Sequence, residues 1–187
     1  EGEFPFAKLC DALQSGGSLD IDGINYLNDG EFALKEPYIG KSSAPEIDID
    51  AYANALNGRI AYIETNRGCP YSCAFCLSGR CSKLRFFDLD QVKKDIINLA
   101  NSGTQTLKFV DRTFNANSKR ANEILTFIKD NYGTKIPKNI CFHFEIAGDI
   151  LTEATLEILS QMPIGAVQLE IGMQSFNEET LQKINRK

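Results

Sequence analysis

The stretch of sequence that decides the fold covers residues 60–76 and reads Ile-Ala-Tyr-Ile-Glu-Thr-Asn-Arg-Gly-Cys-Pro-Tyr-Ser-Cys-Ala-Phe-Cys. Its first four residues are apolar or β-forming, which predicts a strand. A glycine and a proline then bend the chain, and three cysteines with the spacing C-x3-C-x2-C occupy the bend. A turn this tight can direct three thiols toward one point. The thiols belong to Cys69, Cys73 and Cys76.

Three closely spaced cysteines are compatible with several kinds of site. Iron–sulfur clusters are held by cysteine thiolates, normally four, so three ligands would leave one iron open to a group that is not protein. Zinc also accepts cysteine, but usually from two separated C-x2-C pairs or with histidines, and the only histidine here is the distant His143. Disulfides need an oxidising compartment, which a chain without an apparent signal peptide does not suggest. We rank the cluster first, zinc second and inert buried thiols third.

The loop resembles the cluster-binding loop of radical S-adenosylmethionine (radical SAM) enzymes, which has the pattern C-x3-C-x-Phe-C after a strand. The resemblance implies that the three cysteines hold a [4Fe-4S] cluster whose open iron is chelated by the amino and carboxylate groups of SAM. It implies that Phe75 packs near the adenine. It also implies that one electron, from a donor such as flavodoxin or ferredoxin, cleaves SAM to methionine and a 5′-deoxyadenosyl radical.

From residue 59 onward, strands alternate with helices, which predicts an α/β fold with a parallel sheet. Radical SAM domains are partial TIM-like barrels of six such units, and the resemblance implies that about four are present here. Residues 106–110 are apolar-leaning without interruption, as expected of a buried parallel strand. The expected strands are 60–64, 106–110, 139–146 and 165–171. The expected helices are 88–101, 118–132, 152–161 and one that begins at Asn177.

Residues 1–58 form an N-terminal extension in this prediction, and residues 59–187 a radical SAM core that is truncated at its C-terminal end. A short helix over residues 6–13 precedes a hairpin over residues 21–34, and residues 37–57 form a polar linker. The extension resembles the tail of the cobalamin-binding domain that precedes many radical SAM domains, and an extension that packs on the barrel is the alternative. We expect the chain to be part of a longer protein, in which cobalamin would be a further cofactor.

Polar side chains occur at the carboxyl ends of the predicted strands, where ligand sites gather in parallel α/β folds. Residues 171–177 are similar to the fourth-strand segment of radical SAM enzymes of the coproporphyrinogen-dehydrogenase type. That match implies that Gln174 binds the ribose hydroxyls, that Glu145 meets the SAM ammonium and that Arg186 pairs with the SAM carboxylate. The alternatives are a backbone-capping amide for Gln174, an ion pair for Glu145 and a solvated helix residue for Arg186.

Two further carboxylates are candidates for contact with SAM. Asp111 follows the second strand, where many family members carry Gly-Gly-Glu, and the segment matches the Asp-x-x-Phe variant of the cobalamin-linked members. This implies a contact with the SAM ammonium, and an Asx-type turn is the alternative. Glu170 on the fourth strand is expected either to touch the ribose or to face the barrel interior.

Composition limits the remaining possibilities. The net charge is −5, with 20 basic and 25 acidic residues, so the chain lacks the general basic footprint of a nucleic-acid-binding protein. No apolar run approaches the ~20 residues of a membrane span, and we expect a cytoplasmic protein. Cys10 and Cys141 are interpreted as small core residues. Cys81 is interpreted as a loop thiol, and a stray cluster ligand or a crosslinking partner is the alternative. His143 is interpreted as a satisfied core histidine, and a side chain that points into the barrel toward the substrate is the alternative.

Two functions therefore remain open. The first is a radical SAM enzyme of the cobalamin-linked subgroup, some of whose members transfer methyl groups. Its substrate, a small molecule or a peptide, is not identified by the sequence. The second is a non-catalytic zinc or iron–sulfur binding module.

Overall fold

The computed structural model describes residues 2–40, 56–80 and 83–186. Two compact units are present, Glu1–Pro45 and Glu46–Lys187. Most of the predicted linker, and Cys81 with it, lies outside the described residues. The assignment of the first unit to the tail of a cobalamin-binding domain stays a prediction.

The first unit contains the predicted helix and hairpin. Helix α1 covers Glu3–Ser15, and strands β1 (Tyr26–Asn28) and β2 (Glu31–Ala33) form an antiparallel pair. The two-residue turn between the strands is Asp-Gly, with positive φ at both residues (50° and 87°), as a tight hairpin turn requires. The first strand is shorter than predicted, because residues 21–25 lie outside it.

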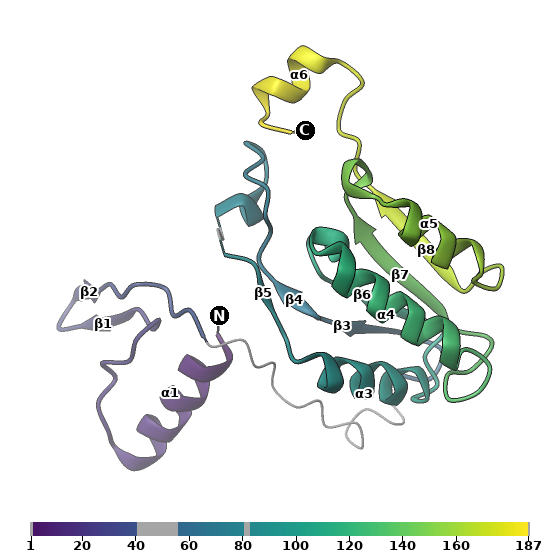
Figure 1. The fold of residues 1–187 in the computed structure, drawn as a ribbon. Coiled ribbons are helices and arrows are strands. Elements are labelled where there is room, and N and C mark those ends of the chain that lie inside the picture. The colour runs from purple at the N-terminus through teal and green to yellow at the C-terminus, as the bar shows by residue number, and fades with distance from the viewer. Residues whose placement is uncertain (1, 41–55, 81–82, 187) are drawn as a thin grey trace. The chain divides into compact units, whose positions relative to one another are not determined.

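The second unit is built on one parallel sheet of four strands in the order β3-β6-β7-β8 (Figure 1). The strands cover Ile60–Ile63, Thr106–Phe109, Cys141–Ile146 and Val167–Ile171. All four predicted strands are present, and their spatial order follows their order in the chain. The predicted α/β class with about four βα units is confirmed.

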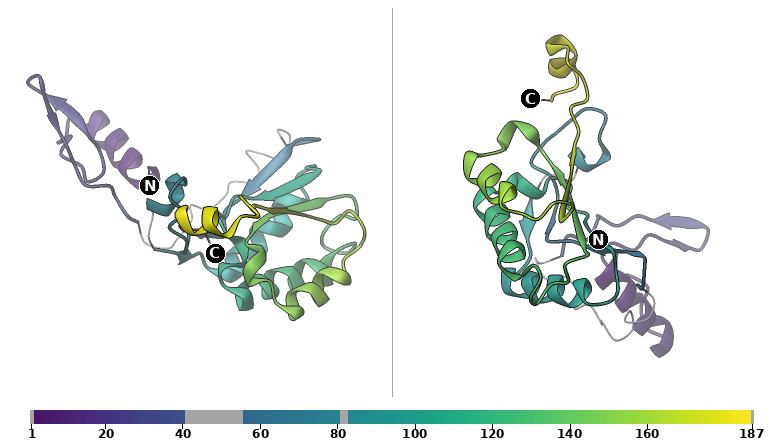
Figure 2. Two further views of the ribbon diagram at one scale, coloured as in Figure 1. Left: turned by 90° about the horizontal axis from the view of Figure 1, so that it is seen from above. Right: turned by 90° about the vertical axis from the view of Figure 1, so that its right-hand side faces the viewer.

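Helices α3 (Leu89–Ala100), α4 (Ser118–Asn131) and α5 (Glu153–Ser160) connect the strands and cover one face of the sheet (Figures 1 and 2). Helix α6 (Glu178–Lys183) follows β8 and lies apart from this layer, beyond the carboxyl end of β8 (Figure 1). Among the described residues, no helix is both long and apolar enough to cross a membrane.

Local side-chain caps explain where the described helices of the second unit begin. In each, the side chain of the N-cap residue accepts a hydrogen bond from a backbone N–H in the first turn, which supplies a partner to one of the unpaired donors there. The four caps are Asp88, Asn117, Thr152 and Asn177. The predicted capping box of α3 is only half formed, because the Gln91 amide donates to Asp95 (2.9 Å).

The core lies between the sheet and its helices. Burial alternates along β6 and β7, so that one face of each strand is buried and the other is half-buried. The buried face carries Phe109, Phe142 and Phe144, and the ring centroid of Phe144 is 4.4 Å from those of Phe109 and Phe114. The strand expected at residues 106–110 is buried at Leu107 and Phe109, and it is half-buried at Thr106 and Lys108.

A small ladder that the sequence did not predict closes the cysteine loop. Strand β4 (Asn66–Arg67) pairs antiparallel with β5 (Arg85–Phe86). Gly68 has φ +102°, and a Cβ there would lie 2.5 Å from the carbonyl oxygen of Lys83. Glycine at this position therefore allows the two ends of the loop to approach closely. Three 3-10 segments, Leu77–Arg80, Phe114–Ala116 and Gly148–Ile150, complete the described elements.

Candidate functional site

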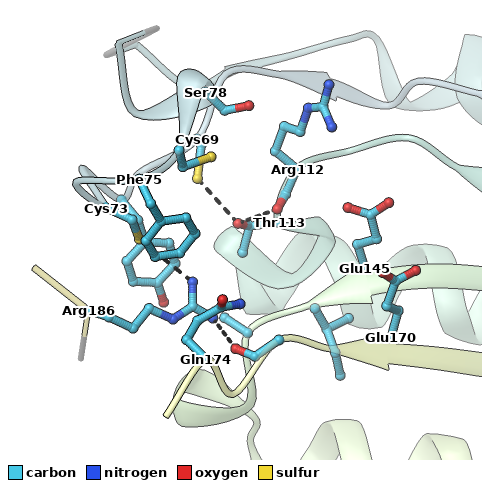
Figure 3. Close-up of a pocket in the computed structure, with 15 residues that line it drawn as sticks. Cys69, Cys73, Phe75, Ser78, Arg112, Thr113, Glu145, Glu170, Gln174 and Arg186 are labelled. Atoms are coloured by element: carbon cyan, nitrogen blue, oxygen red, sulfur yellow. Dashed lines mark hydrogen bonds between the residues drawn. The ribbon is translucent and has the colours of Figure 1, made fainter. Parts of the chain in front are cut away.

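A pocket of about 220 Å³ lies where the cysteine loop meets the carboxyl ends of the strands (Figure 3). It is lined from the cysteine loop, from the loop after β6, from the ends of β7 and β8, and by Arg186. Eight of the nine predicted site residues line it. They are Cys69, Cys73, Phe75, Cys76, Glu145, Glu170, Gln174 and Arg186.

The three cysteines of the loop share this pocket with hydrogen-bonding groups from distant parts of the chain. The Sγ atom of Cys69 lies 3.4 Å from the Thr113 hydroxyl, and that of Cys73 lies 3.8 Å from a guanidinium nitrogen of Arg186. Cys73 is buried, and its carbonyl accepts from the backbone N–H of Cys76 (3.0 Å). No disulfide joins any two of the cysteines that the structure describes.

The cysteine geometry bears on the choice between zinc and a cluster. Within residues 2–40, 56–80 and 83–186, no three histidine, cysteine or acidic side chains are close enough together to hold a single metal ion. A tetrahedral zinc with Zn–S bonds of about 2.3 Å needs its sulfur atoms within about 4 Å of one another. A cluster places each thiolate on a different iron atom, so its ligands are spread more widely. Three soft sulfur ligands that line one pocket fit the donor chemistry of an iron–sulfur cluster.

The segment that carries Arg186 is bound directly to the cysteine loop. The backbone N–H of Ala74 donates to the carbonyl of Ile184 (2.9 Å). The side-chain amide of Asn185 donates to the hydroxyl (2.6 Å) and the carbonyl (3.1 Å) of Ser72. These bonds fix residues that are more than a hundred positions apart in the chain, and they hold the segment that follows α6 at the pocket.

Arg186 is therefore part of the pocket wall. Its Nη2 donates to the carbonyl oxygen of Gly172 (2.8 Å), and its guanidinium carbon lies 5.5 Å from the ring centroid of Tyr71. A guanidinium has five N–H donors, so this anchoring leaves donors for an anion. The alternative of a solvated helix residue does not describe the side chain, which is partly buried.

Glu145 and Glu170 reach the pocket from the sheet face opposite helices α3, α4 and α5. Lys108 lies between them, with its Nζ atom 3.3 Å from Glu145 Oε1 and 3.5 Å from Glu170 Oε2. The Nε2 atom of His143 is 3.2 Å from Glu170 Oε2, although no well-aligned hydrogen bond forms. His143 is consequently not the satisfied core histidine that the sequence predicted. Glu145 therefore both lines the pocket and forms the ion pair that was the alternative, with Lys108 as its partner.

Gln174 adopts a backbone conformation that is uncommon for a residue with a side chain. Its φ is +61°, in the left-handed region. A Cβ on Gly172 would lie 2.7 Å from the Gln174 side-chain amide, so the glycine leaves room for that amide. Strained backbone of this kind concentrates at ligand sites, and here it places a hydrogen-bonding amide on the pocket wall (Figure 3).

Asp111 is the predicted site residue that the structure does not bring to the pocket. It is fully buried, and its carboxylate accepts hydrogen bonds from the backbone N–H groups of Thr65 (2.6 Å) and Asn66 (3.0 Å) and from the Thr65 hydroxyl. The predicted contact with the SAM ammonium is therefore replaced by a structural role. The carboxylate holds the start of the cysteine loop against the end of β6 and does not form a local Asx turn.

This burial makes a prediction about stability and pH. Desolvation raises the pKa of Asp111 to about 6, despite the three donors that favour the charged form. A carboxyl whose pKa is raised by folding contributes stability below its unfolded value of 3.8, and this stability is lost as the pH rises through about 6. The shift corresponds to about 3 kcal/mol.

We therefore expect the unfolding free energy of the wild type, relative to that of the Asp111→Asn variant, to fall by up to about 3 kcal/mol between pH 4 and 7. Urea unfolding of both proteins across this range measures the difference. The exposed Asp90, replaced by asparagine, is the matched control. A difference that is constant with pH, or that grows in favour of the wild type, would contradict the raised pKa.

Several pocket residues were not assigned a role from the sequence. Tyr71, Arg112 and Thr113 line the pocket, and burial raises the pKa of the Tyr71 hydroxyl. Asn115 does not line the pocket but holds Ala147, which does. The Asn115 side-chain amide accepts from the Ala147 N–H (2.9 Å) and donates to the Ala147 carbonyl (2.8 Å). Only their positions in the sequence could have indicated a role. Arg112, Thr113 and Asn115 follow the end of a predicted strand, and Tyr71 lies within the cysteine loop.

Comparison with protein families gives a match over residues 63–187 to the model of the radical SAM superfamily. The chain belongs to the radical SAM superfamily. Membership implies a [4Fe-4S] cluster and SAM as cofactors, and it confirms the family expected from the cysteine loop. The matched range contains every residue that lines the pocket.

Relatives of this radical SAM chain include two methyltransferases. An uncharacterized methyltransferase from Pyrococcus horikoshii is 31% identical over 140 residues, which cover 69% of this chain and 30% of the relative. The 2-(S-pantetheinyl)-carbapenam-3-carboxylate methyltransferase from Streptantibioticus cattleyicolor is 45% identical over 53 residues, covering 27% of this chain and 8% of the relative. The chain thus spans less than a third of the length of either protein.

The fold of this radical SAM chain is similar to that of a solved methyltransferase. TsrM from Kitasatospora setae, bound to tryptophan and a SAM analog, matches with a TM-score of 0.74 at 17% identity, covering 100% of this chain and 40% of TsrM. A second structure of TsrM, with cobalamin and a [4Fe-4S] cluster bound, gives the same TM-score over 99% of this chain. The partial TIM-like barrel of the radical SAM type is thereby confirmed.

Proposed function

We propose that this chain is the cluster- and SAM-binding part of a radical SAM enzyme, and that the whole protein catalyses a cobalamin-linked methyl transfer. The observation that carries the first part is the convergence of Cys69, Cys73 and Cys76 with polar side chains from two strand ends in one pocket. The two methyltransferase relatives and the fold similarity to TsrM support the second part.

The pocket offers complementary groups for each part of SAM. Arg186 presents a guanidinium fork that suits the SAM carboxylate. Glu145 presents an anion for the SAM ammonium, and Gln174 and Glu170 present acceptors and donors for the ribose. Phe75, whose side chain is 55% exposed, offers an apolar ring at the pocket for the adenine.

The cysteine thiolates would hold the cluster, and the cluster supplies the electron for reductive cleavage of SAM when bound. The Lys108 ammonium lies between the carboxylates of Glu145 and Glu170. Its positive charge reduces the repulsion between the two carboxylates. Arg186 places a positive charge beside Cys73, where an anionic cluster would benefit from it. The electron donor, whether flavodoxin or ferredoxin, is a further part of the proposal.

Anaerobic reconstitution with iron and sulfide tests the cluster. About four of each per chain are expected. SAM and dithionite are then added, and the 5′-deoxyadenosine formed is quantified. This assay uses the full-length protein, with any sequence that is encoded on either side of this chain. Iron binding without SAM turnover would instead support a non-catalytic iron–sulfur module, and stoichiometric zinc would support a zinc module.

Arg186 gives a sharper test of the SAM pose. A hydrogen bond to a charged group contributes about 1.5–3 kcal/mol, so Arg186→Leu is expected to raise the Kd for SAM roughly 10- to 150-fold. Calorimetry on the reconstituted protein measures the Kd, and iron content shows whether the cluster is retained. Lys183→Ala is the matched control, because that side chain is 73% exposed in the same segment. An unchanged Kd with a full cluster would remove Arg186 from the SAM site.

A further inference from the structure

Thr113 is a buried residue beside the cysteine loop to which no role has been assigned. The residue is only 4% exposed, and its hydroxyl oxygen lies 3.4 Å from Cys69 Sγ. The dashed line between Cys69 and Thr113 in Figure 3 marks this contact. The same hydroxyl lies 2.7 Å from the carbonyl oxygen of Arg112 and donates to it. The hydroxyl therefore has one proton and two neighbouring acceptors, a sulfur and a carbonyl oxygen.

The state of Cys69 decides which group donates in this contact. A protonated thiol can donate to the Thr113 oxygen while the hydroxyl donates to Arg112. A cysteine that ligates a metal has lost its proton, so only the hydroxyl can then supply a hydrogen to the contact. The hydroxyl group can rotate about its C–O bond, which allows the proton to turn from the carbonyl to the sulfur.

The loop that carries Thr113 is anchored on both sides. Asp111 is bound to the start of the cysteine loop through Thr65 and Asn66, and Asn115 is bound to Ala147 at the end of β7. Asp111, Thr113 and Asn115 are all buried. Cys69 and Thr113 are therefore held at hydrogen-bonding distance by bonds that do not involve either side chain.

We propose that Thr113 donates a hydrogen bond to Cys69 Sγ when Cys69 is a cluster ligand, and that this bond raises the reduction potential of the cluster. The proposal rests on the proposed function, which makes Cys69 a ligand. Reduction adds one negative charge to the cluster, so a donor beside a ligand sulfur stabilises the reduced state more than the oxidised state. Thr113 acts through Cys69 and is a positioning residue.

The test compares Thr113→Val, which removes the hydroxyl at nearly constant shape, with Thr113→Ser, which retains it. Each reconstituted protein is titrated with a reductant, and the reduced cluster is followed by electron paramagnetic resonance. We expect the valine variant to shift to a more negative potential by about 59 mV, which is a tenfold change in a one-electron equilibrium constant. The serine variant is expected to match the wild type, as is Thr134→Val, which removes an exposed hydroxyl.

Each outcome decides the proposal. A valine variant with a full cluster and an unchanged potential would overturn it. If the valine variant binds no iron, Thr113→Ala is compared with Thr113→Ser in the same way, and failure of both hydroxyl-free variants to assemble a cluster would assign Thr113 to assembly and overturn the tuning role. A wild-type chain that binds no iron would instead contradict the proposed function, so the two failures are distinguishable.

Discussion

Replacing Cys73 by alanine is expected to abolish the cluster that we propose for this pocket. Each thiolate of a three-cysteine site holds a separate iron, so the loss of one ligand leaves the cluster with too few protein bonds to persist. The iron and sulfide content after reconstitution should fall from about four of each per chain to a small fraction of that value. Cys69→Ala and Cys76→Ala should have the same effect, and cleavage of SAM should be lost with the cluster.

Cys141→Ala is the matched control for this experiment. Cys141 is half-buried on β7 and does not line the pocket, so its removal takes away a thiol without touching the proposed ligands. Cys81→Ala is a second control, because the sequence leaves this nearby cysteine as a competing ligand. Retention of iron by the Cys73 variant, or loss of iron from the Cys81 variant alone, would contradict the assignment of ligands.

The second large effect is expected from Phe144→Ala. The Phe144 ring is fully buried at the centre of an aromatic cluster with Phe109 and Phe114, with centroid distances of 4.4 Å to each. Removing a buried phenylalanine ring loses its transfer free energy and leaves a cavity, at a cost of about 3–5 kcal/mol. These three aromatic rings join β6, β7 and the loop after β6. We therefore expect the unfolding free energy of the second unit to fall by this amount.

Urea unfolding followed by circular dichroism measures this loss. Phe176→Ala is the matched control, since the Phe176 side chain is 89% exposed and its removal should change the free energy by less than about 0.5 kcal/mol. A decrease in unfolding free energy below about 1 kcal/mol for Phe144→Ala would contradict this prediction. It would mean that the aromatic rings around Phe144 close the cavity or that they contribute little to the core.

Regular elements were predicted well, because their signals are local. Asp88 and Asn177 cap the helices that follow them through hydrogen bonds to backbone groups three residues away. Such bonds need no other part of the chain. The β4–β5 ladder was missed because each strand has only two residues, which is too short to produce a periodic pattern.

The site was predicted in part. The cysteine spacing located three thiols of one loop that line the pocket, and the strand ends supplied Glu145, Glu170 and Gln174. Asp111 was assigned to the wrong environment, because a carboxylate after a strand can turn into the pocket or into the protein. Its two backbone donors lie 45 and 46 residues away, and no local pattern contains that pairing.

Local sequence was sufficient for the order of strands and helices, for the helix starts and for the cysteine loop, because those features depend on residues within a few positions of one another. The tertiary structure alone decided which face of β6 is buried, and it alone placed Arg186 beside Cys73 and Thr113 beside Cys69. These contacts join residues 44 and 113 positions apart. Their geometry depends on how the whole sheet packs and where its loops are anchored.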